Sequence, residues 1–180
     1  GVLGLNSQIT VGDIITETNE ERAKLGLPAV SMNEKLNAAA TLKAQNMFAE
    51  NYWAHFAPSG KDPWGFILSS GYKFSYAGEN LARNFYTSED VVEAWMNSPT
   101  HKDNIVNKNY QEIGVAVVDG VLLGQKTTLV VQMFGAEYQP LASLPQVSVS
   151  GEKIDLPKEE VVANRPVLSL GTTQEVKPAL

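Results

Sequence analysis

The hydrophobic periodicity of this chain changes near Tyr110, and this change constrains the fold more than any other feature. Before Tyr110, apolar residues recur at the spacing of amphipathic helices. After it, two runs rich in Val, Ile and Leu, residues 112–118 and 127–134, have the pattern of antiparallel strands. Helices followed by a sheet predict an α+β domain built in layers.

Side chains that cap helix ends divide the first part of the chain. Five such signatures predict five helix starts: Thr10 with Asp13, Ser31 with Glu34, Asp62 before Pro63, Thr87 with Asp90, and Ser98 before Pro99. The second helix should end near Asn51. It should bury one face, to which the lysine contributes its aliphatic stem: Leu36, Ala39, Ala40, Lys43, Met47 and Phe48.

The remaining segments are richer in turn residues. Residues 52–61 and 72–86 predict loops with aromatic anchors, and the two strands are joined by a turn at Asp119-Gly120 or at 124–126. We expect a lead at 1–9, a domain at 10–138 and an extended, proline-rich tail at 139–180. The tail either adds an edge strand to the domain, for which 146–150 has the alternation, or forms a flexible linker.

Charge and composition restrict the function. A formal net charge of −6 argues against nucleic acid and anionic lipid headgroups as partners. The absence of cysteine excludes disulfides, thiolate metal sites and cysteine nucleophiles. No apolar run approaches the ~20 residues of a membrane span. Because the chain begins at Gly1 and not at Met, we expect a trimmed or mature form, which is compatible with a removed signal or anchor at either end.

The residues best suited to chemistry are the two histidines of the chain, His55 and His101, with Glu79 between them. Imidazole binds transition metals and shuttles protons near neutral pH. The three residues are too far apart in sequence for a local metal motif, so their spacing alone does not bring them together. Gly78 beside Glu79 should allow a close backbone approach. Each residue also has an ordinary structural explanation, such as a hydrogen-bonded histidine or a loop-holding carboxylate.

An ordered set of short motifs resembles the CAP superfamily of SCP domains, which includes cysteine-rich secretory proteins, insect venom antigens and plant pathogenesis-related proteins. The bacterial branch without cysteines is the most similar. The motifs occur in family order: TNEERAKLGLPAVSMNEKLNAAA, HFAPSG, GENLA, EAWMNSPTHKDNIVN, EIGVAV and VVQMFG. The resemblance implies a three-layer α-β-α sandwich with a central antiparallel sheet and a cleft.

In the eukaryotic branch that cleft holds two histidines and two glutamates. The resemblance assigns His55, Glu79 and His101 to three of these positions, while the fourth, three residues after Trp95, is Ser98. It therefore implies a cleft formed by His55, Glu79, His101, Ser98 and Asn80. Two imidazoles and one carboxylate can present a divalent cation such as Zn²⁺ or Mg²⁺. The missing carboxylate predicts that such a site at His55 and His101 is weak or absent.

The resemblance implies a secreted protein, extracellular or in the cell envelope, tethered through segments outside this chain. It favours a binding module for an envelope ligand, a lipid, glycan or protein, with Tyr52, Trp53, Phe56 and Tyr76 as candidate walls of the cleft. The alternative enzyme is a metal-assisted hydrolase or peptidase in which His55 and His101 hold the cation and Glu79 activates water. A third interpretation is a polar network that stiffens the cleft and binds nothing.

Overall fold

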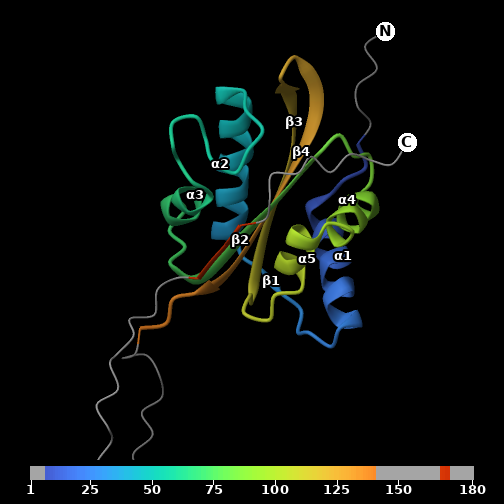
Figure 1. The fold of residues 1–180 in the computed structure, drawn as a ribbon, viewed down its shortest axis with the longest axis vertical. Helices are drawn as coiled ribbons and strands as arrows, with labels where there is room; N and C mark the ends of the chain where they lie inside the picture. The colour runs from blue at the N-terminus through green and yellow to red at the C-terminus, as the bar shows by residue number, and fades with distance from the viewer. Residues whose placement is uncertain (1–6, 141–166, 171–180) are drawn as a thin grey trace, which may run out of the picture.

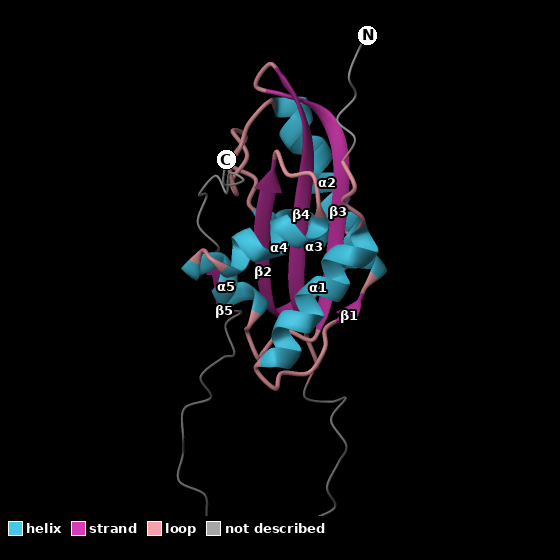
Figure 2. Cartoon of the chain, turned by 90° about the vertical axis from the view of Figure 1, so that its right-hand side faces the viewer, coloured by secondary structure: helices cyan, strands magenta, loops and turns pink. Residues whose placement is uncertain are grey.

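Helices cover both faces of a sheet in the computed structural model, which describes residues 7–140 and 167–170. On one face lie α2 (Glu34–Glu50) and α3 (Pro63–Ser69), and on the other α1 (Val11–Lys24), α4 (Ser88–Met96) and α5 (Pro99–Ile105) (Figure 1). The view turned by 90° shows these last three helices in front of the strands (Figure 2). The predicted three-layer α-β-α sandwich is confirmed.

The sheet has five strands: β1 (Ser31–Met32), β2 (Phe74–Arg83), β3 (Glu112–Leu122), β4 (Gln125–Glu137) and β5 (Val167–Leu170). Their order is β1-β3-β4-β2-β5. Strands β3 and β4 pair antiparallel, as expected, and β2 also pairs antiparallel with β4. The short strands β1 and β5 run parallel to their neighbours β3 and β2. The sheet is therefore antiparallel at its centre and mixed at its edges.

The turn between β3 and β4 lies at Leu123-Gly124, so the predicted turn at Asp119-Gly120 is wrong and the alternative at 124–126 shares only Gly124 with it. Leu122 pairs with Gln125, so only Leu123 and Gly124 form the loop, and both have positive φ, 51° and 80°. Such two-residue turns match the twist of an antiparallel pair. Asp119-Gly120 lies inside β3, where it pairs with β4, and residues 125–126 already belong to β4.

The prediction of a loop at 72–86 is wrong for most of that segment. Phe74–Arg83 is strand β2, which pairs with β4 from Phe74 opposite Glu137 to Arg83 opposite Leu129. Glycine, glutamate and asparagine are poor strand formers, and all three occur at 78–80. They are accommodated because β2 is buried between the helical layers, where their polar groups find partners in other elements.

The predicted start of the second helix is also wrong, by two residues. Ser31 and Met32 pair with Glu112 and Ile113 of β3, and the cap is Asn33, whose side chain accepts from two backbone N–H groups of the first turn. The other cap predictions hold better. The side chains of Thr10, Asp62 and Thr87 each accept a hydrogen bond from a backbone N–H group, as expected. Helix α2 ends at Glu50, and its C-cap Asn51 has φ in the left-handed region, close to the predicted end. Ser98 holds the N-cap position of α5, but its side chain makes no capping hydrogen bond.

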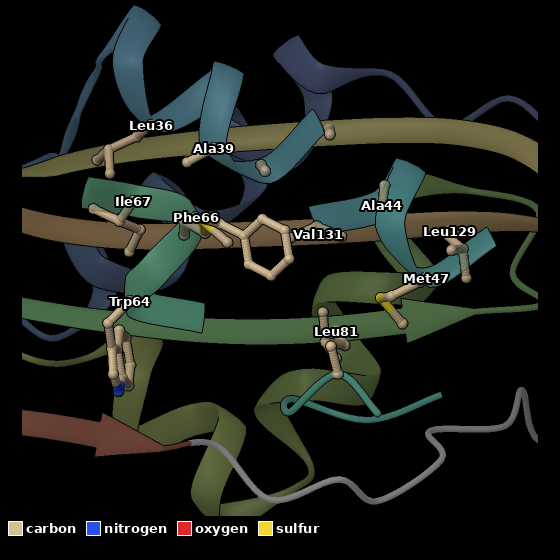
Figure 3. Close-up of a cluster of buried hydrophobic side chains, with 14 of the residues drawn as sticks. Leu36, Ala39, Ala44, Met47, Trp64, Phe66, Ile67, Leu81, Leu129 and Val131 are labelled. Carbon is tan, nitrogen blue, oxygen red and sulfur yellow. The ribbon is translucent and has the colours of Figure 1, made fainter. Parts of the chain in front are cut away.

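Two hydrophobic clusters occupy the spaces on either side of the sheet. Under α2 and α3, side chains of both helices meet those of β2 and β4 (Figure 3): Leu36, Met47, Phe66, Ile67, Leu81, Leu129 and Val131. Under α1, α4 and α5, the second cluster gathers Ile14, Val91, Trp95, Ile105, Val130 and Phe134. Trp95 also donates its Nε1–H to the carbonyl of Leu81, which ties α4 to β2.

The division into lead, domain and tail stays a prediction. Within the proposed tail, Val167–Leu170 forms the edge strand β5 beside Tyr76–Glu79 of β2. Residues 1–6, 141–166 and 171–180 lie outside the described residues, and so does the alternating run at 146–150.

Helix α2 approaches the sheet most closely at Gly114 of β3. A Cβ atom at this position would lie 2.1 Å from the carbonyl carbon of Leu36 and 2.4 Å from the backbone nitrogen of Asn37. Backbone atoms of a helix packed against a sheet do not move aside locally, so only glycine fits.

We therefore expect Gly114→Ala to lower the free energy of unfolding by roughly 3 kcal/mol, because the added methyl group forces α2 away from the sheet. Gly12→Ala is the control, since a Cβ atom at this exposed position of α1 has nothing within 4 Å. That change should alter stability by less than about 1 kcal/mol, in the stabilising direction. Urea unfolding measures both, and equal stability of the two variants would contradict the packing argument.

Candidate functional site

A buried histidine–carboxylate pair joins the segment after α2 to the middle of β2. His55 Nδ1 lies 2.6 Å from Glu79 Oε1, and the two side chains are only 4% and 0% exposed. An ionised carboxylate can only accept hydrogen bonds, so with Glu79 ionised the proton of His55 is on Nδ1 and a lone pair is on Nε2.

The second polar atom of each side chain in this pair has no partner within the part of the chain that the structure describes. Neither His55 Nε2 nor Glu79 Oε2 makes a hydrogen bond, although both atoms are buried. Most buried polar atoms of native proteins are hydrogen-bonded, so two such atoms in one residue pair are unusual. Both are acceptors when Glu79 is ionised and His55 is neutral, and in that state the pair favours donor groups.

The second histidine is held by Ser98. His101 lies on α5 and is buried, and its Nδ1 is 2.8 Å from Ser98 Oγ at the preceding N-cap position. This contact explains why the Ser98 side chain does not cap the helix. Burial lowers the pKa of His101 to about 4, and the positive charge that His55 can carry contributes to this lowering, so His101 is neutral at pH 7.

Asn80 lies on the opposite face of β2 from Glu79, as neighbours on a strand do. Its amide nitrogen donates to the carbonyl of His101 (3.1 Å) and to Gln132 Oε1 (3.0 Å), and its Oδ1 accepts from Asn104 Nδ2 (2.9 Å). The side chain is thus engaged inside the protein, where it anchors α5 to the sheet.

The bonds around Asn80 belong to a polar network that the sequence analysis missed. Gln132 of β4 donates to Thr18 of α1 (2.8 Å), and Tyr110 donates to the carbonyl of Ala77 (3.0 Å). The Tyr110 side chain packs closely against the backbone of β2 at Gly78. A Cβ atom at this position would lie 2.4 Å from the Tyr110 hydroxyl. The sequence signal that could have revealed this network is Gln132, a polar residue inside the apolar run 129–134.

Lys43 is the other functional candidate that sequence reasoning overlooked. Its whole side chain is buried, not only the stem, and its amino group donates to the carbonyls of Ala54 (3.0 Å) and His55. Burial lowers the pKa of Lys43, while the nearby charge of Glu79 acts in the opposite direction. A positive charge and a negative charge therefore both lie close to His55.

The expected metal ligands do not form a metal centre in this arrangement. Among residues 7–140 and 167–170, no three His, Asp or Glu side chains lie where they could hold an ion together. One ring nitrogen of each histidine is already engaged, by Glu79 and by Ser98. The donor set does not fit a three-ligand site, so the divalent cation stays a prediction and enters no step below.

The described residues also contain no helix that combines the length and the apolar character needed to cross a bilayer.

Comparison with known proteins gives one family. The profile of the cysteine-rich secretory protein family (CAP) matches residues 15–134. A relative from Bacillus subtilis, the uncharacterized protein YkwD, is 41% identical over 106 residues, which make up 59% of this chain and 41% of the relative. The chain thus corresponds to less than half of that protein.

Two solved structures share the fold. An extracellular protein containing an SCP domain from Bacillus anthracis superposes with a TM-score of 0.64 at 24% identity, over 71% of this chain and 40% of that one. An outer surface protein from Borrelia burgdorferi gives a TM-score of 0.62 at 26% identity, over 69% of this chain and 90% of that one.

The lowered pKa of His101 predicts how stability depends on pH. The unfolded chain binds a proton at this histidine near pH 6.5, but the folded chain binds it only near pH 4. Between these values the unfolded state holds more protons than the folded state. Acidification from about pH 6.5 to about pH 4 should therefore lower the free energy of unfolding by on the order of 2–3 kcal/mol.

Urea unfolding across this range measures the effect, with His101→Gln as the matched variant because glutamine does not titrate. The wild type should lose more stability than the variant on acidification. Parallel pH profiles for the two proteins would show that His101 titrates alike in the folded and unfolded states.

Proposed function

The chain belongs to the cysteine-rich secretory protein (CAP) family, and from this premise we propose that it is a binding module that works outside the cell or in the cell envelope. Two solved proteins of the same fold support the location, since one is described as extracellular and the other as an outer surface protein. The proposed ligand is an envelope component, a lipid, a glycan or a protein.

The observation that carries the proposal is the pair of unpartnered acceptors, His55 Nε2 and Glu79 Oε2. A buried polar atom without a hydrogen bond costs about 1–3 kcal/mol. A ligand that donates hydrogen bonds to both atoms recovers this cost on binding. Sugar hydroxyls, backbone N–H groups and hydroxylated headgroups all supply such donors.

Phe56 presents an exposed aromatic ring next to His55 in the sequence. It follows His55 directly and is 50% exposed, whereas Tyr52 is buried and Trp53 and Tyr76 are partly buried. Of the four aromatic residues expected to line the cleft, Phe56 therefore presents the most surface to a ligand. An exposed aromatic ring beside polar atoms is typical of sites that bind amphipathic groups.

The alternative function is a hydrolase, and one contact favours it. A carboxylate that holds the Nδ1–H of an imidazole leaves Nε2 as a base, which can take a proton from water. The metal-assisted form of this reaction has less support, because the described residues place no three ligands together. A hydrolase would therefore have to rely on His55 and Glu79 alone.

We expect Glu79→Gln to abolish ligand binding while the fold is retained, because glutamine keeps the shape but can present an N–H group where the carboxylate accepts. The control is Glu93→Gln, an exposed glutamate of α4. Cell-wall glycan fragments, vesicles of envelope lipids and a peptide library serve as probes, with affinities measured by calorimetry. If none of the probes binds the wild type more tightly than Glu79→Gln, the proposed function is wrong.

Metal binding is tested by thermal unfolding with Zn²⁺ and Mg²⁺. An ion that binds the folded state raises the melting temperature. We expect equal small shifts for the wild type and for His55→Ala, because the described donor set does not form a three-ligand site. A rise for the wild type that His55→Ala removes would favour the metal-assisted hydrolase over the binding module.

A further inference from the structure

Lys43 is a fully buried lysine in the middle of the core face of α2. Its side chain is 0% exposed, and the helix buries Ala39, Ala40, Ala44 and Met47 around it. Lysine is almost never fully buried without a partner, because removing an ammonium group from water is costly. A specific set of contacts must therefore keep it there.

The contacts of Lys43 Nζ account for all of its hydrogen-bonding capacity. An ammonium group has three N–H donors, and Nζ has three acceptors: the carbonyls of Ala54 and His55 and the hydroxyl of Tyr52, the last at 3.4 Å. The Tyr52 hydroxyl gives its own proton to Asn46 (2.7 Å), so its oxygen faces the lysine as an acceptor. A neutral amine has too few hydrogens for this set, which points to the charged form.

Two further interactions stabilise that charge in the interior. The rings of Tyr52 and Phe66 lie with their centroids 5.1 and 5.5 Å from Nζ, within the range of cation–π attraction. Glu79 also favours the ammonium form, against the effect of burial. Lys43 is the positive counterpart of a carboxylate that is itself 0% exposed.

All three acceptors belong to the segment that carries His55. Residues 52–55 leave the end of α2 without regular secondary structure, and the backbone N–H of Tyr52 ties the start of the segment to the carbonyl of Met47. Lys43 lies two turns back in the rigid helix and bonds to the carbonyl of His55 itself. The helix thereby controls where the His55 side chain starts.

We propose that Lys43 is a positioning residue, whose ammonium group holds the Ala54–His55 backbone so that His55 Nδ1 meets Glu79. This role goes beyond the proposed function, because it concerns how the pair is formed and not what binds to it. The competing explanation is that Lys43 only fills space and contributes stability, in which case the His55–Glu79 hydrogen bond would form without the charge.

Chemical modification separates charge from shape. The chain has no cysteine, so Lys43→Cys introduces a unique thiol, which can be alkylated in denaturant before refolding. Aminoethylation rebuilds a lysine-like side chain with an ammonium group, whereas propylation gives a side chain of the same length without charge. The two products differ in one terminal group.

The readout is the Nδ1–H proton of His55 in nuclear magnetic resonance spectra of untagged protein. A proton shared with a buried carboxylate resonates far downfield and exchanges slowly, and the only other histidine is His101. We expect the signal in the wild type and in the aminoethylated protein, and its loss in the propylated protein. Folded propylated protein that keeps the signal, or aminoethylated protein that refolds without it, would overturn the proposal.

A second arm needs no refolding after modification. Lys43→Met removes the charge in one step and should lose the His55 signal, while Lys35→Met, at an exposed position of the same helix, should retain it. If Lys43→Met does not fold, hydrogen exchange in the wild-type protein provides the test. Its Lys43 ammonium hydrogens should exchange far more slowly than those of Lys35, and equal exchange contradicts the proposal.

These measurements use the protein without ligand. A failure to find a ligand would therefore leave the positioning role of Lys43 standing, and a negative result for Lys43 would leave the binding proposal to its own test.

Discussion

Glu79 and Asn80 are neighbours on a strand buried on both faces, and the site is built around the polar groups that they bring into the interior. Successive side chains of a strand point to opposite faces, so the carboxylate enters one layer and the amide the other. Each needs partners, because an unpaired buried polar group is costly. The segment after α2 supplies His55 for Glu79, while α5 and β4 supply Asn104 and Gln132 for Asn80.

The two faces of β2 differ in how completely these needs are met. On the Asn80 face, bonds run from α1 through β4 and β2 to α5, and such networks fix the relative position of the elements that they join. On the Glu79 face, Oε2 and His55 Nε2 keep acceptor capacity for something else. One strand thus joins a fully bonded network to a buried pair that keeps two unpartnered acceptors, and sites supported by strands hold their geometry better than sites on loops.

Local rules predicted the features that depend on local interactions. Residue patterns predicted the caps at Thr10, Asp62 and Thr87 and the pairing of the two long strands of the β-hairpin. The family resemblance predicted the order of the layers. Strand β2 was missed because Gly78, Glu79 and Asn80 at its centre are poor strand formers that are stabilised by tertiary partners. Lys43 was expected to bury only its aliphatic stem, because helix periodicity shows which face of the helix is buried. It does not show that backbone carbonyls of another segment lie there and accept hydrogen bonds from the amino group. The His55–Glu79 contact needed the family resemblance, since long-range contacts leave no periodic signal.

The presence of Ser98 where the resemblance places a glutamate changes the charge of the site as well as its shape. A carboxylate beside His101 would favour the imidazolium form, whereas a hydroxyl adds no charge and leaves burial to keep the ring neutral. Near His55 the carboxylate of Glu79 faces the ammonium group of Lys43, on which Asp62 and Glu50 also act. Because Lys43 already opposes the charge of Glu79, a further buried cation would gain little to offset its loss of hydration. On this argument Ser98 makes the cleft a poorer cation site than the four-residue cleft that the resemblance describes, which supports the proposal of recognition by hydrogen bonds.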